Sequence, residues 1–202
     1  SWFAHVPGLR VVMPSTVADA RDLLISSVLS PDPVMYIDDR WLYEQEDNLP
    51  PIHESKLQLL KPLIMQEGDD ITIVGLGSTV ESIKEASKEI NASSELIDLL
   101  TLIPWDKEAI LESVKKTGRI VTVEENPFSG GWGSEIISYV TSKCYKELKA
   151  PPFRITAPDT HIPFNEKLEK KYLPSVEYIK NSINKYVETD EVPPSWWEKL
   201  GV

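Results

Sequence analysis

The sequence predicts an α/β fold with a mostly parallel sheet and helices on both of its faces. Short β-rich runs alternate with amphipathic helical segments along the chain, which is typical of strand–helix–strand units. The run DITIVGLG at 70–77 is almost continuously apolar, as strands covered on both faces are. Acids, prolines and weak periodicity interrupt the alternation at 43–68, so we expect two α/β units joined by a linker.

The first predicted unit is a strand, a helix and a second strand. The strands are expected at 9–13 and 34–37, where short β-rich runs occur. Thr16 and Asp19 stand at the spacing of a helix N-cap and predict where the helix begins. The apolar stripe of this helix, expected within 15–30, comprises Val17, Ala20, Leu23, Leu24 and Val28.

The second predicted unit carries the longer series of alternating elements. Asp106 opens one of its helices and Gly118 closes it, at positions that these residue types prefer. Ser78 and Glu81 have the spacing of a capping box at the start of another helix. The expected strands are 70–77, 95–103, 119–125 and 153–157, and the expected helices are 78–90, 106–118, 130–148 and 175–187.

These elements divide the chain into four parts. Residues 1–45 are interpreted as the end of one α/β domain, 46–68 as a linker, 69–187 as a second α/β domain and 188–202 as a tail. A single strand–helix–strand piece cannot bury its own apolar stripe, so it must pack on the second domain, on a partner or on residues that precede it. We therefore expect that Ser1 is not a native start.

Composition excludes several classes of function. The 202 residues carry 21 Lys and Arg against 32 Asp and Glu, and the net charge of −11 argues against nucleic acid and anionic membranes as partners. The lone cysteine, Cys144, excludes an internal disulfide and a thiolate zinc site, and we expect it in the core. Since no apolar run approaches about 18 residues, a membrane span is not expected either. The composition is that of an acidic intracellular protein.

Two glycine-rich loops are candidate sites. Gly75 and Gly77 follow an expected strand, where phosphate-binding loops occur, but Val80 stands at the third fingerprint position and a plain tight turn is preferred. The loop 129–135 follows another strand, at the carboxyl edge of the sheet where α/β folds bind ligands. Its glycines could meet an anion or let another subunit approach closely, and we prefer an interface loop; they are Gly130, Gly131 and Gly133.

Acidic and histidine side chains flank the second loop. Glu124 and Glu125 directly precede it, and such a pair could perform acid–base work if burial separated the pKa values of its carboxyl groups. Asp159 and His161 follow the next strand, in the segment 159–164. Since no partner for this histidine is evident in the sequence, an interface role is preferred to that of a general base.

Several motifs resemble one known family over residues 1–187. SWFAHVPGLRVVMPSTVADARDLL resembles the later part of the pyrimidine-binding domain of thiamine-diphosphate-dependent 2-oxoacid dehydrogenase β subunits. IDLLTLIPWD, ILESVKKTGRIVTVEEN, GGWGSEI, APPFRITAPDTHIPF and LEKKYLPSVEYI resemble the transketolase-like C-terminal domain of these subunits, in order and spacing. The IPWD stretch favours branched-chain enzymes but is too short to decide between them and pyruvate enzymes.

The resemblance implies the role of the whole enzyme. Such a β subunit pairs with an α subunit and a second β subunit, and the enzyme decarboxylates a 2-oxoacid on thiamine diphosphate with Mg²⁺ and acylates lipoyl groups of an acyltransferase. The family's activating glutamate and active-site histidine lie upstream of the segment that matches Ser1, and its diphosphate motif belongs to the α subunit. No catalytic or cofactor-binding residue is therefore expected here. This chain alone should be inactive and should mainly supply subunit association.

The resemblance also assigns interface and ion-binding residues. Branched-chain relatives hold a structural potassium ion with residues that correspond to Ser27, Ser30 and Asp32, although two of the three side chains differ. The acidic surface should suit the subunit-binding domain of the acyltransferase. Leu100 stands where the family usually has arginine, and Glu124 where histidine is common. The loops expected at subunit interfaces contain Glu125, Gly130, Gly131, Gly133, Asp159 and His161.

Two alternatives remain open from the sequence. The chain could belong to a two-chain transketolase-like or acyloin-forming enzyme without a lipoyl partner, or it could be a non-catalytic interaction domain derived from this fold. The preferred interpretation, the dehydrogenase β subunit, places the protein in the cytoplasm, or in the mitochondrial matrix if the source is a eukaryote.

Overall fold

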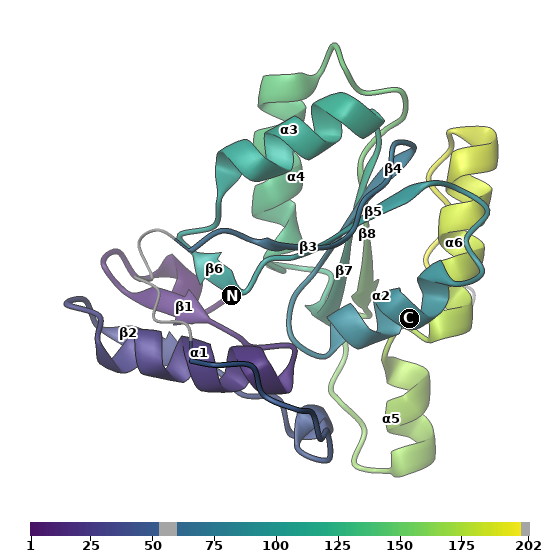
Figure 1. The fold of residues 1–202 in the computed structure, drawn as a ribbon. Helices are drawn as coiled ribbons and strands as arrows, with labels where there is room; N and C mark the ends of the chain where they lie inside the picture. Colours follow the sequence, from purple (N-terminus) through teal and green to yellow (C-terminus); the bar gives the residue numbers. More distant parts are fainter. Residues whose placement is uncertain (53–59, 199–202) are drawn as a thin grey trace.

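The computed structural model describes residues 1–52 and 60–198, which form two sheets and the helices that cover them (Figure 1). The larger sheet has five strands in the order β3-β5-β4-β7-β8. Its neighbouring strands are parallel except at one edge, where β3 runs antiparallel to β5. The mostly parallel α/β sheet predicted from the sequence is confirmed. Its strands are β3 (Leu63–Gln66), β4 (Ile71–Gly75), β5 (Ser94–Asp98), β7 (Ile120–Pro127) and β8 (Phe153–Ala157).

Helices cover both faces of this sheet, as predicted (Figure 1). Helix α2 packs beside α6 on one face, and α3 packs beside α4 on the other. Successive residues of β4 point to opposite faces, so Ile73 belongs to the core under α2 and α6 while Val74 and Cys144 belong to the core under α3 and α4. The helices are α2 (Thr79–Ser87), α3 (Lys107–Thr117), α4 (Gly133–Cys144) and α6 (Val176–Thr189).

Most of the predicted helix ends are confirmed. The Thr16 hydroxyl accepts a hydrogen bond from the Asp19 amide at 3.1 Å, and the helix α1 (Val17–Val28) begins there. The Asp106 carboxylate likewise accepts from the third amide of α3. Gly118 ends α3 with φ of 76°, in the left-handed region where a side chain would be strained.

The capping box predicted at the start of α2 is wrong. Ser78 already has helical dihedral angles and its side chain makes no cap hydrogen bond. Instead, the Thr79 hydroxyl accepts from the Leu76 amide at 3.0 Å and donates to the Leu76 carbonyl at 2.9 Å. The turn after β4 is therefore closed by Thr79, one residue later than the sequence pattern indicated.

A second, three-stranded sheet joins the N-terminal segment to the rest of the chain. Strand β1 (Arg10–Val12) pairs in parallel with β2 (Val34–Tyr36) and antiparallel with β6 (Thr101–Ile103). The single strand predicted at 95–103 is therefore wrong, because β5 and β6 belong to different sheets. The chain turns between them at Leu100, whose φ is 56° and whose amide donates to the Asp98 carboxylate at 3.0 Å.

Three further predictions need correction. Leu24 and Val28 are 49% and 78% exposed, because among the described residues the small sheet packs against the face of α1 that carries Leu23. The predicted linker 46–68 contains β3, so its last residues belong to the larger sheet. A polar helix, α5 (Glu166–Tyr172), lies in a stretch for which no element was predicted. In the described part of the chain, no helix has the length and apolar character that a membrane crossing needs.

Candidate functional site

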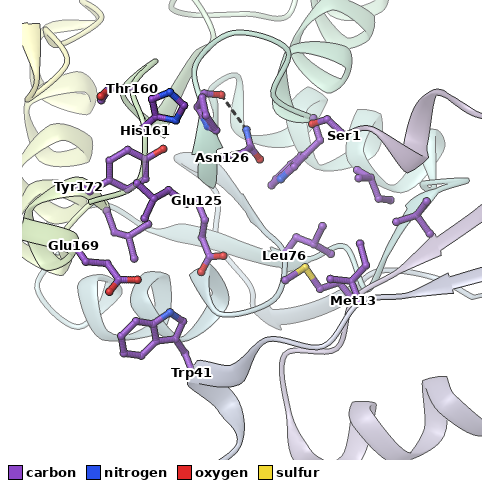
Figure 2. Close-up of a pocket in the computed structure, with 17 residues that line it drawn as sticks. Ser1, Met13, Trp41, Leu76, Glu125, Asn126, Thr160, His161, Glu169 and Tyr172 are labelled. Atoms are coloured by element: carbon purple, nitrogen blue, oxygen red, sulfur yellow. Dashed lines mark hydrogen bonds between the residues drawn. The ribbon is translucent and has the colours of Figure 1, made fainter. Parts of the chain in front are cut away.

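The candidate site lies at the carboxyl edge of the five-stranded sheet. From β4 the chain crosses to β5 on one side, while β7 is followed by β8 on the other side, so the connections diverge between β4 and β7. Ligands of open α/β sheets bind at such a switch point, outside the carboxyl ends of the strands. A cavity of about 540 Å³ opens there and is lined by the last residues of β7 and by residues that follow β4, β7 and β8 (Figure 2).

Two segments from outside the sheet complete the wall of this cavity. The N-terminal unit contributes Met13 and, from the short helix η2 (Arg40–Leu42), the indole of Trp41. The end of α5 contributes Glu169 and Tyr172. A second cavity of about 370 Å³ adjoins it on the α2 and α6 side and shares Trp41, Glu125 and Glu169 with the first. The N-terminal unit thus forms part of the site.

Glu124 is a structural residue beneath the glycine loop. Its side chain is fully buried and pairs with Arg154, whose Nε donates to Oε1 at 2.7 Å and whose Nη2 donates to Oε2 at 3.1 Å. The remaining donors to this carboxylate are the Thr122 hydroxyl, the Asn126 amide group and the Gly133 amide, each at 3.0 Å. A carboxylate with all of these partners is unavailable for proton transfer.

The same carboxylate explains two of the predicted loop glycines. A side chain at Gly131 would collide with Arg154, Asn126 and Glu124, and one at Gly133 would collide with Glu124 and Thr122. The loop can wrap over the buried ion pair only because these positions lack a Cβ. Gly130 differs, since it is exposed, has φ of 71° and has open space around it.

Glu125 has the opposite environment. It lines both cavities and is half-buried, and desolvation together with the nearby Asp39 carboxylate raises its pKa to about 8. The carboxyl group of Glu125 is within hydrogen-bonding reach of Asp39, which belongs to the N-terminal unit. Burial therefore favours the protonated form of the Glu125 carboxyl group at neutral pH, whereas the neighbouring Glu124 carboxylate is engaged in an ion pair with Arg154.

The two loops predicted at subunit interfaces meet at this edge. The Ser129 amide donates to Asp159 Oδ1 at 2.8 Å, and the Ser129 hydroxyl donates to Asp159 Oδ2 at 2.6 Å. These two hydrogen bonds lower the pKa of the Asp159 carboxyl group. His161 is exposed and lines the larger cavity. The structure thus brings together all six residues predicted for the interface, which are Glu125, Gly130, Gly131, Gly133, Asp159 and His161.

The residues proposed for potassium do not fit a cation held by their side chains. The Ser27 hydroxyl donates to the Leu23 carbonyl at 2.6 Å, and Ser30 Oγ accepts from the Asp32 amide at 3.2 Å. Oδ2 of Asp32 pairs with the Arg10 guanidinium at 2.7 Å. Within residues 1–52 and 60–198, no group of three or more His, Cys, Asp or Glu side chains is placed to hold a metal ion.

Sequence reasoning missed the residues that surround Glu124 and Glu125. Arg154 carried a usable signal, because a lone arginine within the apolar run FRITA needs a buried partner. Asp39, Trp41 and Tyr172 carried none, since they come from segments without a strong pattern. Only the fold brings them to the carboxyl edge.

The fold and this edge define the class of protein. A parallel sheet between two helical layers, with its loops gathered against a preceding α/β fragment, is the architecture of transketolase-type chains. The model of the family described as "Transketolase, C-terminal domain" matches residues 61–179, and the chain belongs to this family.

Curated relatives confirm the resemblance to 2-oxoacid dehydrogenase β subunits. The chain is 40% identical over 185 residues to the mitochondrial 2-oxoisovalerate dehydrogenase subunit beta of Dictyostelium discoideum, which covers 90% of this chain and 49% of the relative. It is 37% identical over 186 residues to the pyruvate dehydrogenase E1 component subunit beta of Rhizobium meliloti (strain 1021), which covers 91% of this chain and 40% of the relative. The chain thus spans about half the length, or less, of these relatives.

A solved structure extends the comparison to both parts of the fold. The chain superposes with a TM-score of 0.76 and 25% identity on a structure titled as a split gene transketolase in an inactive β4 tetramer. The match covers 93% of this chain and 60% of that one. It includes the N-terminal unit as well as the family domain.

Proposed function

We propose that the chain is the C-terminal part of the β subunit of a thiamine-diphosphate-dependent 2-oxoacid dehydrogenase. The 40% identity over 185 residues to a 2-oxoisovalerate dehydrogenase subunit beta carries the proposal, because it extends well beyond the family domain. The substrate is then a branched-chain 2-oxoacid or pyruvate. When bound with Mg²⁺ in the whole enzyme, the cofactor supplies the electron sink for decarboxylation.

Within that enzyme, we assign the described residues to subunit association. The carboxyl edge gathers the 129–135 and 159–164 loops, which are tied together through Ser129 and Asp159. Ile162 and Phe164 project into solvent beside them. Apolar side chains held on a fixed loop are typical of interface anchors, and a second β subunit or the α subunit is the partner proposed for them.

A paired substitution tests this assignment. Phe164→Glu in the β subunit, co-expressed with its α subunit, should weaken assembly by at least tenfold in light scattering. Tyr145→Glu is the matched control, since Tyr145 is also an exposed aromatic residue but follows α4 away from the loops. Equal assembly of the two variants would contradict the association surface.

A second measurement tests whether cofactor binding and catalysis require residues outside this chain. Calorimetry with thiamine diphosphate and Mg²⁺ on the 202-residue chain should show no saturable binding at micromolar concentration. Decarboxylation of a branched-chain 2-oxoacid or of pyruvate should appear only after the full β subunit is combined with its α subunit. Binding by the isolated chain would overturn this requirement, and an assembled enzyme that lacks both activities would overturn the proposed function.

A further inference from the structure

Acidic groups from three parts of the chain converge on the cavity at the carboxyl edge. Glu125 lies near the end of β7, Glu169 lies on α5, and Asp39 of the N-terminal unit is within hydrogen-bonding reach of Glu125. Figure 2 shows the carboxyl groups of Glu125 and Glu169 directed toward the same space above the Trp41 ring. Within the described chain, Glu169 forms no ion pair although it is half-buried.

One buried polar atom of the cavity wall has no hydrogen-bond partner among the described residues. Tyr172 is only 4% exposed, and its hydroxyl lines the cavity without a donor or acceptor nearby. Figure 2 shows it beside His161 at the end of the cavity away from Trp41. Buried polar groups normally have partners, so the Tyr172 hydroxyl points to a group that occupies this space. The Asp39 carboxylate differs, because its Oδ1 accepts from the Trp41 amide at 3.0 Å and the Glu125 carboxyl group lies within its reach.

The charges around the cavity determine what kind of group fits. Of the described residues that line it, none is lysine or arginine, and Ser1 lies at the end of the cavity away from Glu169 (Figure 2). The exposed ring of Trp41 offers a face on which a cation can rest. Lys170 lines the adjoining cavity, but its ammonium group pairs with Glu166 at 2.8 Å. An anion at this end would therefore meet the carboxyl groups of Glu125 and Glu169, whereas a cation would pair with them.

We propose that this cavity binds an organic cation, an alkylguanidinium or alkylammonium group, between Glu125, Glu169 and Trp41. A polar group at the far end of the ligand hydrogen-bonds to the Tyr172 hydroxyl. The cation takes the place of the proton that Glu125 holds when the cavity is empty. The proposal concerns the cavity described above and does not depend on the proposed function.

Protons must then leave when the cation binds. The groups that face Glu125 are Asp39 from the N-terminal unit, Glu169 from α5 and, farther away, His161 after β8. Burial and, after it, the neighbouring Asp39 carboxylate raise the pKa of Glu125 to about 8, which favours its protonated form in the empty cavity at neutral pH. A cation reverses this preference. Affinity should therefore rise about tenfold between pH 6.5 and 7.5, with about one proton released for each cation bound.

Calorimetry with 4-guanidinobutanamide as the probe tests the site on the 202-residue chain. Titrations in phosphate and in Tris buffers, which differ in ionisation enthalpy, count the protons released. The neutral analogue 4-ureidobutanamide has the same shape and should not bind. Absence of probe binding, equal binding of the two compounds, or binding that weakens as pH rises would each overturn the proposal.

Variants locate the site and separate it from general electrostatic attraction. Glu125→Gln keeps the shape of the side chain and should weaken probe binding at least tenfold and abolish proton release. Tyr172→Phe should weaken it several-fold without changing proton release. Glu188→Gln removes an equal charge at the exposed end of α6 and is the matched control. An equal loss of binding in Glu188→Gln would contradict a defined site.

A peptide arm identifies the source of the cation. The peptide acetyl-Gly-Arg-Gly-amide presents a guanidinium group on a backbone. Tighter binding than that of 4-guanidinobutanamide would assign the cavity to a basic side chain of a partner protein, and weaker binding would assign it to a small molecule. In both cases, Glu125→Gln must weaken binding of the peptide and of 4-guanidinobutanamide at least tenfold.

Discussion

At the scale of single residues, Glu124 has a structural role, although the sequence allowed it an acid–base role together with Glu125. Its buried ion pair with Arg154 links β7 to β8 and supports the glycine loop. Glu124→Gln would leave the nearly buried guanidinium without its counter-charge, which costs about 3 kcal/mol or more of unfolding free energy. Urea unfolding measures this loss. The control is Glu81→Gln, which breaks an exposed pair with Lys84 and should change stability by less than about 0.5 kcal/mol.

Glu125 gives the protein a pH dependence of stability. Burial and the neighbouring Asp39 raise its pKa from 4.5 to about 8 in the folded protein. The folded state therefore holds a proton that the unfolded state has lost, and this contribution to stability falls as pH rises from about 4.5 to about 8. Between pH 6 and 8, wild type should lose about 2 kcal/mol more than Glu125→Gln. Thermal unfolding at the two pH values measures the difference.

Asp98 provides the internal reference for this measurement. Its burial raises its pKa to about 7, so it contributes a loss of the same sign in both proteins and cancels in the comparison. Parallel pH curves for wild type and Glu125→Gln would contradict the assignment of the proton to Glu125.

At the scale of elements, the C-terminal tail packs against Phe128, the residue that precedes the glycine loop 129–135. After α6, the Pro194 carbonyl accepts from the Tyr178 hydroxyl at 3.0 Å, and the Trp197 ring lies 6.1 Å from that of Phe128. Phe128 in turn stacks on the Arg154 guanidinium at 5.1 Å. The tail, for which the sequence indicated no role, therefore closes over the ion pair of Glu124.

Trp197→Ala should weaken the packing of the tail on Phe128. We expect hydrogen exchange in 127–133 to accelerate about tenfold, with a loss of about 1 kcal/mol of stability from the ring contact. Exchange followed by mass spectrometry measures both the loop and the remaining amides. Trp2→Ala removes a ring that is almost fully exposed, so it should leave the loop unchanged. Unchanged exchange at 127–133 in Trp197→Ala would contradict a stabilising role of the tail for this loop.

The elements of the larger sheet could be predicted because their patterns are local. Continuous apolar runs identified the covered strands, and Asp106 with Gly118 fixed the ends of α3. The turn at Leu100 could not be predicted, because the apolar pattern continues through it and its cause is Asp98, which also accepts a hydrogen bond from the distant Ser15. The Glu124–Arg154 pair likewise joins residues 30 positions apart.

At the scale of the whole molecule, the N-terminal unit depends on the second domain for its core. Strand β1 pairs with β6, and Val11 joins the core under α3 and α4. Within residues 1–52 and 60–198 the outer face of α1 has no such cover, and Leu24 and Val28 are exposed on it, as is Leu29 just after the helix. The sequence predicted that this unit must pack elsewhere. The structure shows that it pairs with β6 of the second domain.

This arrangement predicts an order of opening. Among the described strands, β2 pairs only with β1, and none of its three residues is fully buried. The N-terminal unit should therefore open with a free energy well below that of global unfolding. Hydrogen exchange should be fastest at 34–36, slower at 10–12, and slowest at 71–75 and 120–123 in the buried strands β4 and β7. Val12→Ala should accelerate exchange at both 10–12 and 34–36 while leaving 71–75 unchanged, since Val12 packs with Leu23 and Leu100 in a separate small cluster. Equal protection of all four segments in the 202-residue chain would show instead that the two sheets unfold as one cooperative unit.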